Sequence, residues 1–324
     1  MKRWLLTGMA LLALPIMTFA QGEAKGYRNA TGSVCSDGSS CNKGCCAQPS
    51  SGSCCCPNLC GHWSLEGAAL YWKVCFDDEL LGFGDTFFDT VRPGNEWGFK
   101  VKGQWSSCDW KKFVSLTYWY FDESDHGRTP IIESTDGLGQ NEYFFAKLHH
   151  EYQRLSARAG HYCCYDPCKG GLYAYGGISW IYIKDRSRFD ANQLPLQRGQ
   201  YQAAGFEAGV GARYKICGGF GLAAELGGVA AIGDRKSQIE VGFTTITTYR
   251  RPQVTLCVPG LDTKLEAFYE CCWCGFDWGL FVGYEQHYFW NVKKNSPLLN
   301  PTPLAARNQD FGVGGLYFGA RVGI

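Results

Sequence analysis

The sequence lacks an excess of either charge, and beyond its first 20 residues it lacks any long apolar run. Its 31 lysine and arginine residues nearly balance 30 aspartate and glutamate residues, which gives a formal net charge of +1. Nucleic-acid binding needs a basic surface, so we expect no nucleic-acid partner. A transmembrane helix needs about 18 consecutive apolar residues, and none follows Ala20. Any membrane crossing must therefore be made by strands.

Motifs of the common enzyme classes are also missing. The sequence contains no G-x-S-x-G, no H-E-x-x-H and no P-loop. His149 and His150 are adjacent, so in a strand they would point to opposite faces and could not share a site. His161 lies near Cys163, but a thiol in an oxidising compartment is more often part of a disulfide than catalytic. We expect no enzyme, no catalytic residue and no cofactor.

The N-terminus has the pattern of a secretory signal. Lys2 and Arg3 precede an apolar stretch over 4–16, and a small-x-small site ends at Ala20. This pattern predicts a signal peptide over 1–20, cleaved near Ala20. Cleavage would leave 29 basic and 30 acidic residues, a net charge of −1. An exported chain with 18 cysteines indicates an oxidising compartment in which disulfides form.

Residues 21–61 form a segment of different composition. It is polar, rich in glycine and serine, holds eight cysteines and has no hydrophobic periodicity. The cysteine spacing contains no pair of C-x2-C knuckles, and His62 is the only imidazole nearby, so disulfides are favoured over zinc. We expect a cysteine-rich periplasmic segment without a metal site.

From residue 62 onward, apolar and polar residues alternate in long runs. Between Glu96 and Ser106, Phe99 and Val101 share one face and Lys100 and Lys102 the other. The same alternation recurs over 204–216, 276–290 and 316–324. The apolar faces run about 9 to 16 residues, long enough to cross a bilayer as tilted strands. The residues assigned to lipid are Phe99, Val101, Phe206, Leu280, Val282 and Phe318.

The alternating runs predict ten strands joined by alternating short and long connections, as in bacterial outer-membrane barrels. A further strand-like run over 239–249 leaves twelve strands as an alternative, and a soluble β-sandwich core is the rival interpretation of the aromatic clusters. The predicted fold class is all-β: a transmembrane antiparallel β-barrel of about 10–12 strands over 62–324. The expected strands lie near 62–76, 95–106, 112–122, 142–162, 171–183, 201–216, 219–232, 263–272, 275–291 and 309–324.

The face opposite the apolar one predicts the lining of a pore for passive diffusion of small hydrophilic solutes. Eight strands enclose a filled interior and sixteen an open channel, so ten to twelve could conduct slowly or hardly at all. Inward glycines favour an unfilled lumen, whereas the alternative is a structural, cross-linking or adhesin-type surface barrel with little conductance. Those glycines are Gly209, Gly211, Gly279, Gly283 and Gly319. The predicted lining residues are Lys100, Lys102, Lys147, Glu207, Arg213, Lys215, Glu225, Glu266, Glu285 and Arg321.

Sixteen cysteines fall in the N-terminal segment or in and beside the short turns, which predicts a disulfide-competent periplasmic face. Sequence cannot assign the pairing, so local bridges and links to a second copy or to other cysteine-rich envelope proteins both stay open. The candidates are Cys35, Cys41, Cys45, Cys46, Cys54, Cys55, Cys56, Cys60, Cys108, Cys163, Cys164, Cys168, Cys217, Cys271, Cys272 and Cys274.

Four short strings occur in an order that carries a family resemblance. They are ALYWK at 69–73, PGNEWGFKV at 93–101, GGISWI at 176–181 and GYEQHYFWN at 283–291. Together they resemble the Legionella-type and chlamydia-like major outer membrane proteins over about 62–324, whereas residues 21–61 lie outside the resemblance and Ile324 stands where an aromatic residue is usual. The resemblance implies an abundant outer-membrane β-barrel porin, joined by disulfides into the envelope in chlamydia-like relatives. The partners it implies are outer-membrane lipid and the barrel-assembly machinery.

Overall fold

The computed structural model describes most of the chain from residue 62 onward. The described ranges are 62–75, 82–83, 86–87, 94–107, 111–130, 143–166, 170–189, 196–217, 219–241, 247–250, 253–273, 276–294 and 308–323. The predicted signal peptide over 1–20 and the predicted cysteine-rich segment over 21–61 lie outside these ranges.

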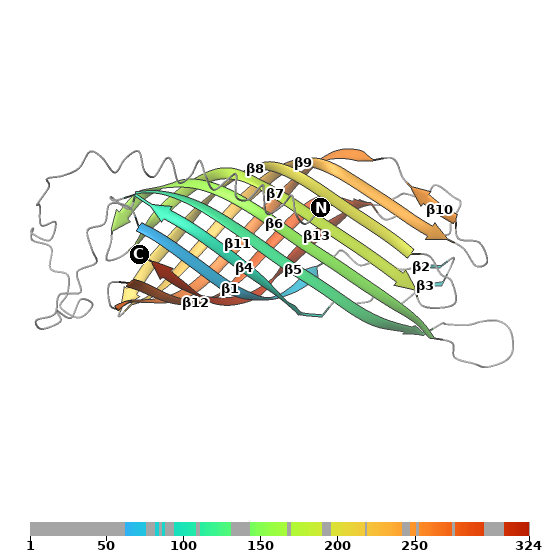
Figure 1. The fold of residues 1–324 in the computed structure, drawn as a ribbon, viewed down its shortest axis with the longest axis horizontal. Helices are drawn as coiled ribbons and strands as arrows, with labels where there is room; N and C mark the ends of the chain where they lie inside the picture. The colour runs from blue at the N-terminus through green and yellow to red at the C-terminus, as the bar shows by residue number, and fades with distance from the viewer. Residues whose placement is uncertain are drawn as a thin grey trace, which may run out of the picture. The chain divides into compact units, whose positions relative to one another are not determined.

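Every regular element in the described ranges is a β-strand (Figure 1). Ten are long, and three are short: β2 (Gly82–Phe83), β3 (Thr86–Phe87) and β10 (Thr247–Arg250). The long strands are β1 (His62–Cys75), β4 (Glu96–Ser106), β5 (Lys112–Pro130), β6 (Tyr143–Asp166), β7 (Gly170–Phe189), β8 (Leu196–Cys217), β9 (Phe220–Val241), β11 (Val254–Trp273), β12 (Phe276–Lys294) and β13 (Asn308–Gly323).

The ten long strands close into one antiparallel ring. The hydrogen-bonded order runs β9-β11-β12-β13-β1-β4-β5-β6-β7-β8, and β8 pairs back onto β9. The first strand pairs with the last, from Ser64 opposite Gly323 to Cys75 opposite Gly312. A closed ring leaves no strand edge unpaired, which is the condition for crossing hydrocarbon with strands. The predicted all-β transmembrane barrel is confirmed, with ten strands.

The twelve-strand alternative is wrong, because the run over 239–249 adds no crossing. Its first residues end β9, and the four residues of β10 pair with that end, from Thr247 opposite Val241 to Arg250 opposite Gln238. β10 and β11 therefore pair with the same edge of β9, β10 near its C-terminal end and β11 from Arg235, opposite Val254, toward its N-terminal end.

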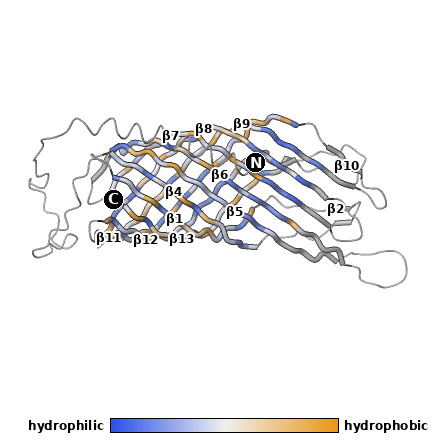
Figure 2. The backbone as a smooth tube through the Cα atoms, viewed as in Figure 1, coloured by the Kyte–Doolittle hydropathy of each residue, from blue (hydrophilic) through white to orange (hydrophobic). Residues whose placement is uncertain are grey.

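Several strands extend farther than their hydrophobic alternation. β5 reaches Pro130, β9 reaches Val241 and β11 begins at Val254, so these strands extend well into the long connections that the expected strands left between 122 and 142 and between 232 and 263. The extensions of β5 and β9 are polar, which hid them from a pattern based on apolar alternation, whereas the extension of β11 over 254–262 is mainly apolar and was missed for all that. All three have backbone groups paired with neighbouring strands. In Figure 2 the strand ends that lead toward β2 and β10 are mainly hydrophilic.

The alternation of the two faces is confirmed along the central part of the barrel. The residues assigned to lipid lie on the outside, and Phe206, for example, is 77% exposed. Figure 2 shows hydrophobic and hydrophilic residues alternating along these strands. Because the ten long strands form one closed ring, the fold is not the pair of packed sheets that makes up a soluble β-sandwich. Among the described residues, no helix has the length and apolar character needed to span a membrane.

We call the end of the barrel with the brief connections the short-turn end. Adjacent strands meet there through residues 107–111, 167–169, 218–219 and 274–275, and β1 begins and β13 ends at the same end. The opposite end, which carries β2, β3 and β10, is the long-loop end.

Candidate functional site: the barrel interior

The structure places the sequence-predicted lining residues on the inward face wherever their side chains are described. Lys100, Glu207, Glu266 and Glu285 are buried inside the barrel. Five others are partly buried on the same face: Lys102, Arg213, Lys215, Glu225 and Arg321. Lys147 lies in β6, opposite Arg188 in register, and its side chain is outside the described part. A role in lining a conducting pore stays a prediction for all ten.

A network of buried charges spans the centre of the interior. The Arg154 guanidinium on β6 donates two hydrogen bonds of 2.7 Å to Asp262 on β11 and one of 2.5 Å to Glu207 on β8. Its Nη1 also lies 3.0 Å from Nδ1 of His287 on β12, and the same imidazole nitrogen lies 2.7 Å from Asp262 Oδ1. Ser156 also hydrogen-bonds Glu207. Arg154 is fully buried, so these contacts replace its hydration.

Sequence reasoning missed Arg154, Asp262 and His287. A signal was present for Arg154, because Tyr152, Arg154 and Ser156 occupy alternate positions of the strand predicted over 142–162, on the face that proves to be inward. No pattern in the sequence indicated that Arg154 would meet His287, 133 residues away.

A second group of charges adjoins the first. Lys100 donates to Glu285 at 2.9 Å, and the Trp119 indole nitrogen donates to the same carboxylate at 3.2 Å. The Lys100 ammonium also lies 4.2 Å from the centre of the Tyr317 ring. Glu66 accepts a hydrogen bond of 2.7 Å from Arg321. With the Arg154 network these pairs form a transverse layer of charge across the barrel.

Toward the long-loop end, the interior is filled by apolar and aromatic side chains. The ring of Tyr152 on β6 is tilted against two others: its centre lies 6.2 Å from that of Phe289 on β12 and 5.8 Å from that of Phe311 on β13. Strands β6 and β12 are five places apart in the ring of ten, so this contact joins opposite walls. Trp72 and Phe121 are also fully buried and lie 6.1 Å apart. We call these residues the aromatic layer.

Apart from Gly279, whose Cβ position has no atom closer than 3.5 Å, the inward glycines do not enclose open space, which corrects one sequence expectation. A Cβ atom at Gly209 would collide with the Tyr175 hydroxyl, and one at Gly319 would lie 2.6 Å from the Phe281 ring. Gly283 would similarly meet the Tyr317 hydroxyl at 2.6 Å. These glycines leave room for rings that cross from neighbouring strands, and so they contribute to a filled interior.

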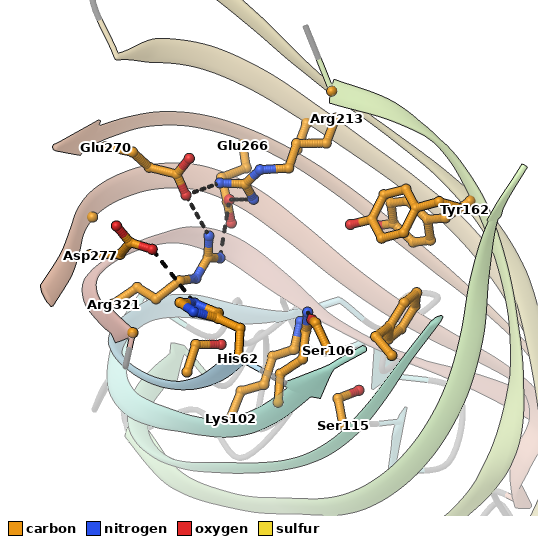
Figure 3. A pocket seen from close by; sticks show the side chains of 18 of the residues that line it. His62, Lys102, Ser106, Ser115, Tyr162, Arg213, Glu266, Glu270, Asp277 and Arg321 are labelled. Atoms are coloured by element: carbon orange, nitrogen blue, oxygen red, sulfur yellow. Dashed lines mark hydrogen bonds and ion pairs between the residues drawn. The ribbon is translucent and has the colours of Figure 1, made fainter. Parts of the chain in front are cut away.

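At the short-turn end, the interior opens into a polar chamber of about 480 Å³ (Figure 3). Its lining includes six basic side chains and four carboxylates. The basic residues are Lys102, Arg158, Arg213, Lys215, Lys264 and Arg321, and the acidic residues are Glu225, Glu266, Glu270 and Asp277. The transverse layer of charge and the aromatic layer separate this chamber from the long-loop end.

Few of the predicted disulfide cysteines can be located with their side chains. Cys163 on β6 and Cys271 on β11 are exposed and carry no disulfide within the described residues. Cys164, Cys217 and Cys272 lie in strands near the short-turn end, but their side chains are outside the described part. The eight N-terminal candidates and Cys108, Cys168 and Cys274 lie outside the described ranges altogether. Disulfide pairing therefore stays a prediction.

A closed antiparallel ring with an apolar outer band defines an integral outer-membrane β-barrel protein. The chain belongs to the Legionella major outer membrane protein family, because the family described as Legionella pneumophila major outer membrane protein precursor matches residues 55–324. The match covers the whole barrel and begins seven residues before β1. The barrel and the family together place the chain in the outer membrane.

Solved barrels of other kinds share low similarity with the chain. The outer membrane protease OmpT from Escherichia coli is 8% identical, with a TM-score of 0.45, over 81% of this chain and 96% of that one. Ail, the attachment invasion locus protein of Yersinia pestis, is 10% identical, with a TM-score of 0.32, over 82% and 100%. The toluene transporter TbuX of Ralstonia pickettii is 8% identical, with a TM-score of 0.27, over 82% and 89%. Among curated proteins, no match is found.

Proposed function

We propose that this protein is mainly a structural barrel of the outer membrane, with little conductance in its resting state. One observation carries the proposal: Tyr152 and Arg154 on β6 reach Phe289 and His287 on the opposite strand β12. A solute on the central axis would have to displace these side chains. The described interior offers a chamber at one end, not a continuous lumen.

Opening the centre would be energetically costly. If Arg154 separated from Asp262 and Glu207 without rehydration, three charged side chains, each at most 8% exposed, would lose an ion-pair partner that no water replaces. Breaking one partner from such a buried pair typically costs about 3–5 kcal/mol. Each increment of about 1.4 kcal/mol lowers the population of a state tenfold, so a conformation that breaks this network would be rare.

Exposed cysteines at the short-turn end support the structural role. In outer-membrane barrels the short turns face the periplasm, and the exposed thiols of Cys163 and Cys271 lie at that end. After signal-peptide cleavage near Ala20, the cysteine-rich segment over 21–61 would lead into β1 at the same end. We propose that these cysteines link the barrel to a second copy or to other cysteine-rich envelope proteins, in addition to local bridges.

Passive diffusion of small hydrophilic solutes is the second candidate function. The observation that favours it is the polar chamber, whose ten charged side chains would suit a hydrated vestibule. In this alternative, the aromatic layer and the Arg154 network would act as a constriction that opens transiently.

Planar-bilayer recording of the refolded mature protein separates the two candidates. We expect few or no conductance steps from wild type and more steps from the double variant Tyr152→Ala, Phe289→Ala, which removes two rings of the aromatic layer and leaves the Arg154 network in place. Val282→Ala on the lipid face is the matched control and should behave as wild type. Regular steps from properly folded wild-type protein, identified by heat-modifiable migration in electrophoresis, would overturn the structural proposal in favour of diffusion.

Electrophoresis of alkylated envelopes tests the cross-linking. With thiols blocked at lysis, we expect ladders without reductant that collapse to a single band with reductant. A single band under both conditions would leave only internal bridges.

A further inference from the structure

The polar chamber at the short-turn end has two unlike walls. All four lining carboxylates come from β9, β11 and β12: Glu225, Glu266, Glu270 and Asp277. The wall formed by β4 and β5 instead carries Lys102 and neutral polar groups, namely Gln104, Ser106 and Ser115. Figure 3 shows Lys102, Ser106 and Ser115 on one side of the chamber, with Arg213, Glu266 and Glu270 on the other.

Three of the four carboxylates of the first wall have a lysine or arginine as an ion-pair partner, and the fourth, Asp277, lies near an imidazole. Glu266 lies 2.7 Å from the Lys264 ammonium, and Glu270 lies 2.5 Å from Arg213 and 3.4 Å from Arg321. Glu225 lies 2.6 Å from Arg158 and accepts a hydrogen bond of 2.9 Å from the Tyr173 hydroxyl. Asp277 is 3.8 Å from His62. Ion pairs with lysine and arginine thus balance most of the negative charge on this wall.

Lys102 is in the opposite situation. Within the described residues, its ammonium makes no hydrogen bond and has no carboxylate oxygen within 4.0 Å. Its register partner on β1 is Glu66, but that carboxylate lies 2.7 Å from Arg321 and 3.7 Å from Lys100. The chamber lining therefore has two more basic than acidic side chains, and the ammonium of Lys102 has no carboxylate in direct contact among the described residues.

Two hydroxyl groups lie on the same wall of the chamber as this ammonium. Ser106 and Ser115 are each only 4% exposed and line the chamber on the same wall. Gln104 donates from its amide to the Ser106 hydroxyl at 3.2 Å, which leaves the hydroxyl hydrogen of Ser106 available to another acceptor. An ammonium with nearby hydroxyl donors in a confined site matches the acceptor oxygens of carboxylates and phosphates.

We propose that the chamber binds a small oxyanion, carried on a phosphate or carboxylate group, with Lys102 as its counter-ion. Ser106 and Ser115 donate hydrogen bonds to the same group, and Arg321 and Lys264 add positive potential from across the chamber. A volume of about 480 Å³ falls within the range of small-molecule sites and accommodates a dicarboxylate or a phosphorylated sugar. Because the chamber lies at the short-turn end, the ligand would enter from the periplasm. The site does not depend on whether the barrel conducts.

Isothermal titration of the refolded, full mature chain in detergent micelles tests the site. The probes are inorganic phosphate and succinate, which separate the two oxyanion classes, with choline as the cationic control. We expect saturable binding of at least one anion and none of choline. Lys102→Met should weaken that binding about tenfold or more, as expected for loss of one hydrogen bond to a charged group. Lys102→Arg should retain most of it.

The matched control is Lys112→Met, because Lys112 is exposed at the start of β5 and does not line the chamber. Heat-modifiable migration verifies that each variant is folded. If Lys102→Met fails to fold, Ser115→Ala provides the second test and should weaken binding severalfold. The proposal is overturned if wild type binds neither anion saturably, or if folded Lys102→Met, or failing that Ser115→Ala, binds as tightly as Lys112→Met.

Discussion

Arg154 on β6 and Asp262 on β11 are joined across the barrel by two parallel hydrogen bonds of 2.7 Å each. Such a two-point pair fixes both the distance and the orientation of the two strands. The same guanidinium also holds Glu207, so a single side chain connects three strands that are not neighbours. The pair therefore braces the inside of a ring that is otherwise held by its ladder of backbone hydrogen bonds.

Removing this brace should destabilise the barrel strongly. Arg154→Ala leaves Asp262 and Glu207 buried without their principal counter-ion, and we expect the free energy of unfolding to fall by about 3–5 kcal/mol. Urea unfolding in micelles, followed by tryptophan fluorescence, measures the change. Lys236→Ala is the control, since Lys236 is exposed and makes no ion pair within the described residues, and its effect should stay within about 0.5 kcal/mol. Equal effects of the two substitutions would refute the bracing role.

A charged side chain on the lipid face should lower the free energy of unfolding by an amount that depends on its depth in the bilayer. Val101→Arg and Leu280→Arg place a cation in the apolar band and should each cost about 2–4 kcal/mol near the bilayer midplane. Gln202→Arg introduces the same side chain at an exposed outward position toward the long-loop end, where we expect about 0–1 kcal/mol. Reversible unfolding from lipid vesicles measures all three. A cost for Gln202→Arg as large as that for Leu280→Arg would contradict the assigned membrane position.

Two arginines face each other on the outer surface, and reversing one charge should stabilise the protein. Arg186 on β7 lies directly opposite Arg198 on β8, and both are exposed. Directly opposed like charges destabilise a strand pair, whereas opposite charges contribute about 0.2–1 kcal/mol. We therefore expect Arg198→Glu to raise the free energy of unfolding by that amount.

A double-mutant cycle provides the control for this pair. Arg186→Glu combined with Arg198→Glu restores like charges and should remove the gain. If the two single substitutions and the double substitution are simply additive, the residues do not interact and the prediction fails.

The parts of the fold that sequence predicted are those with a local signal. Phe99 and Lys100 occupy opposite faces because side chains alternate along a strand, and that rule needs no knowledge of the partner strand. The same rule placed Glu207 and Glu285 inside the barrel. The polar ends of β5 and β9 escaped it because their residues lack apolar alternation, although their backbone pairing continues.

The side-chain contacts that fill the interior could not be predicted from the sequence, for a different physical reason. Contacts such as Tyr152 with Phe289 depend on how the strands are staggered around the ring, which sets the level at which opposite side chains meet. The face on which a residue lies can be read from its own strand. The stagger between opposite walls depends on the register of all ten strand pairs together, and the sequence of one strand does not contain it. Inward glycines were for this reason interpreted as open space, whereas Gly319 faces the Phe281 ring.

The seam between β1 and β13 governs how the barrel can form. Ser64 pairs with Gly323, a contact between residues about as far apart as the barrel sequence allows. Closing so long a loop carries a large entropic penalty, and folding slows as the mean sequence separation of contacts rises. Until that last pairing forms, β1 and β13 each present a bare row of amide and carbonyl groups. During assembly, pairing of β1 with β13 therefore competes with aggregation through these unpaired edges, and this competition lasts until β13 is in place.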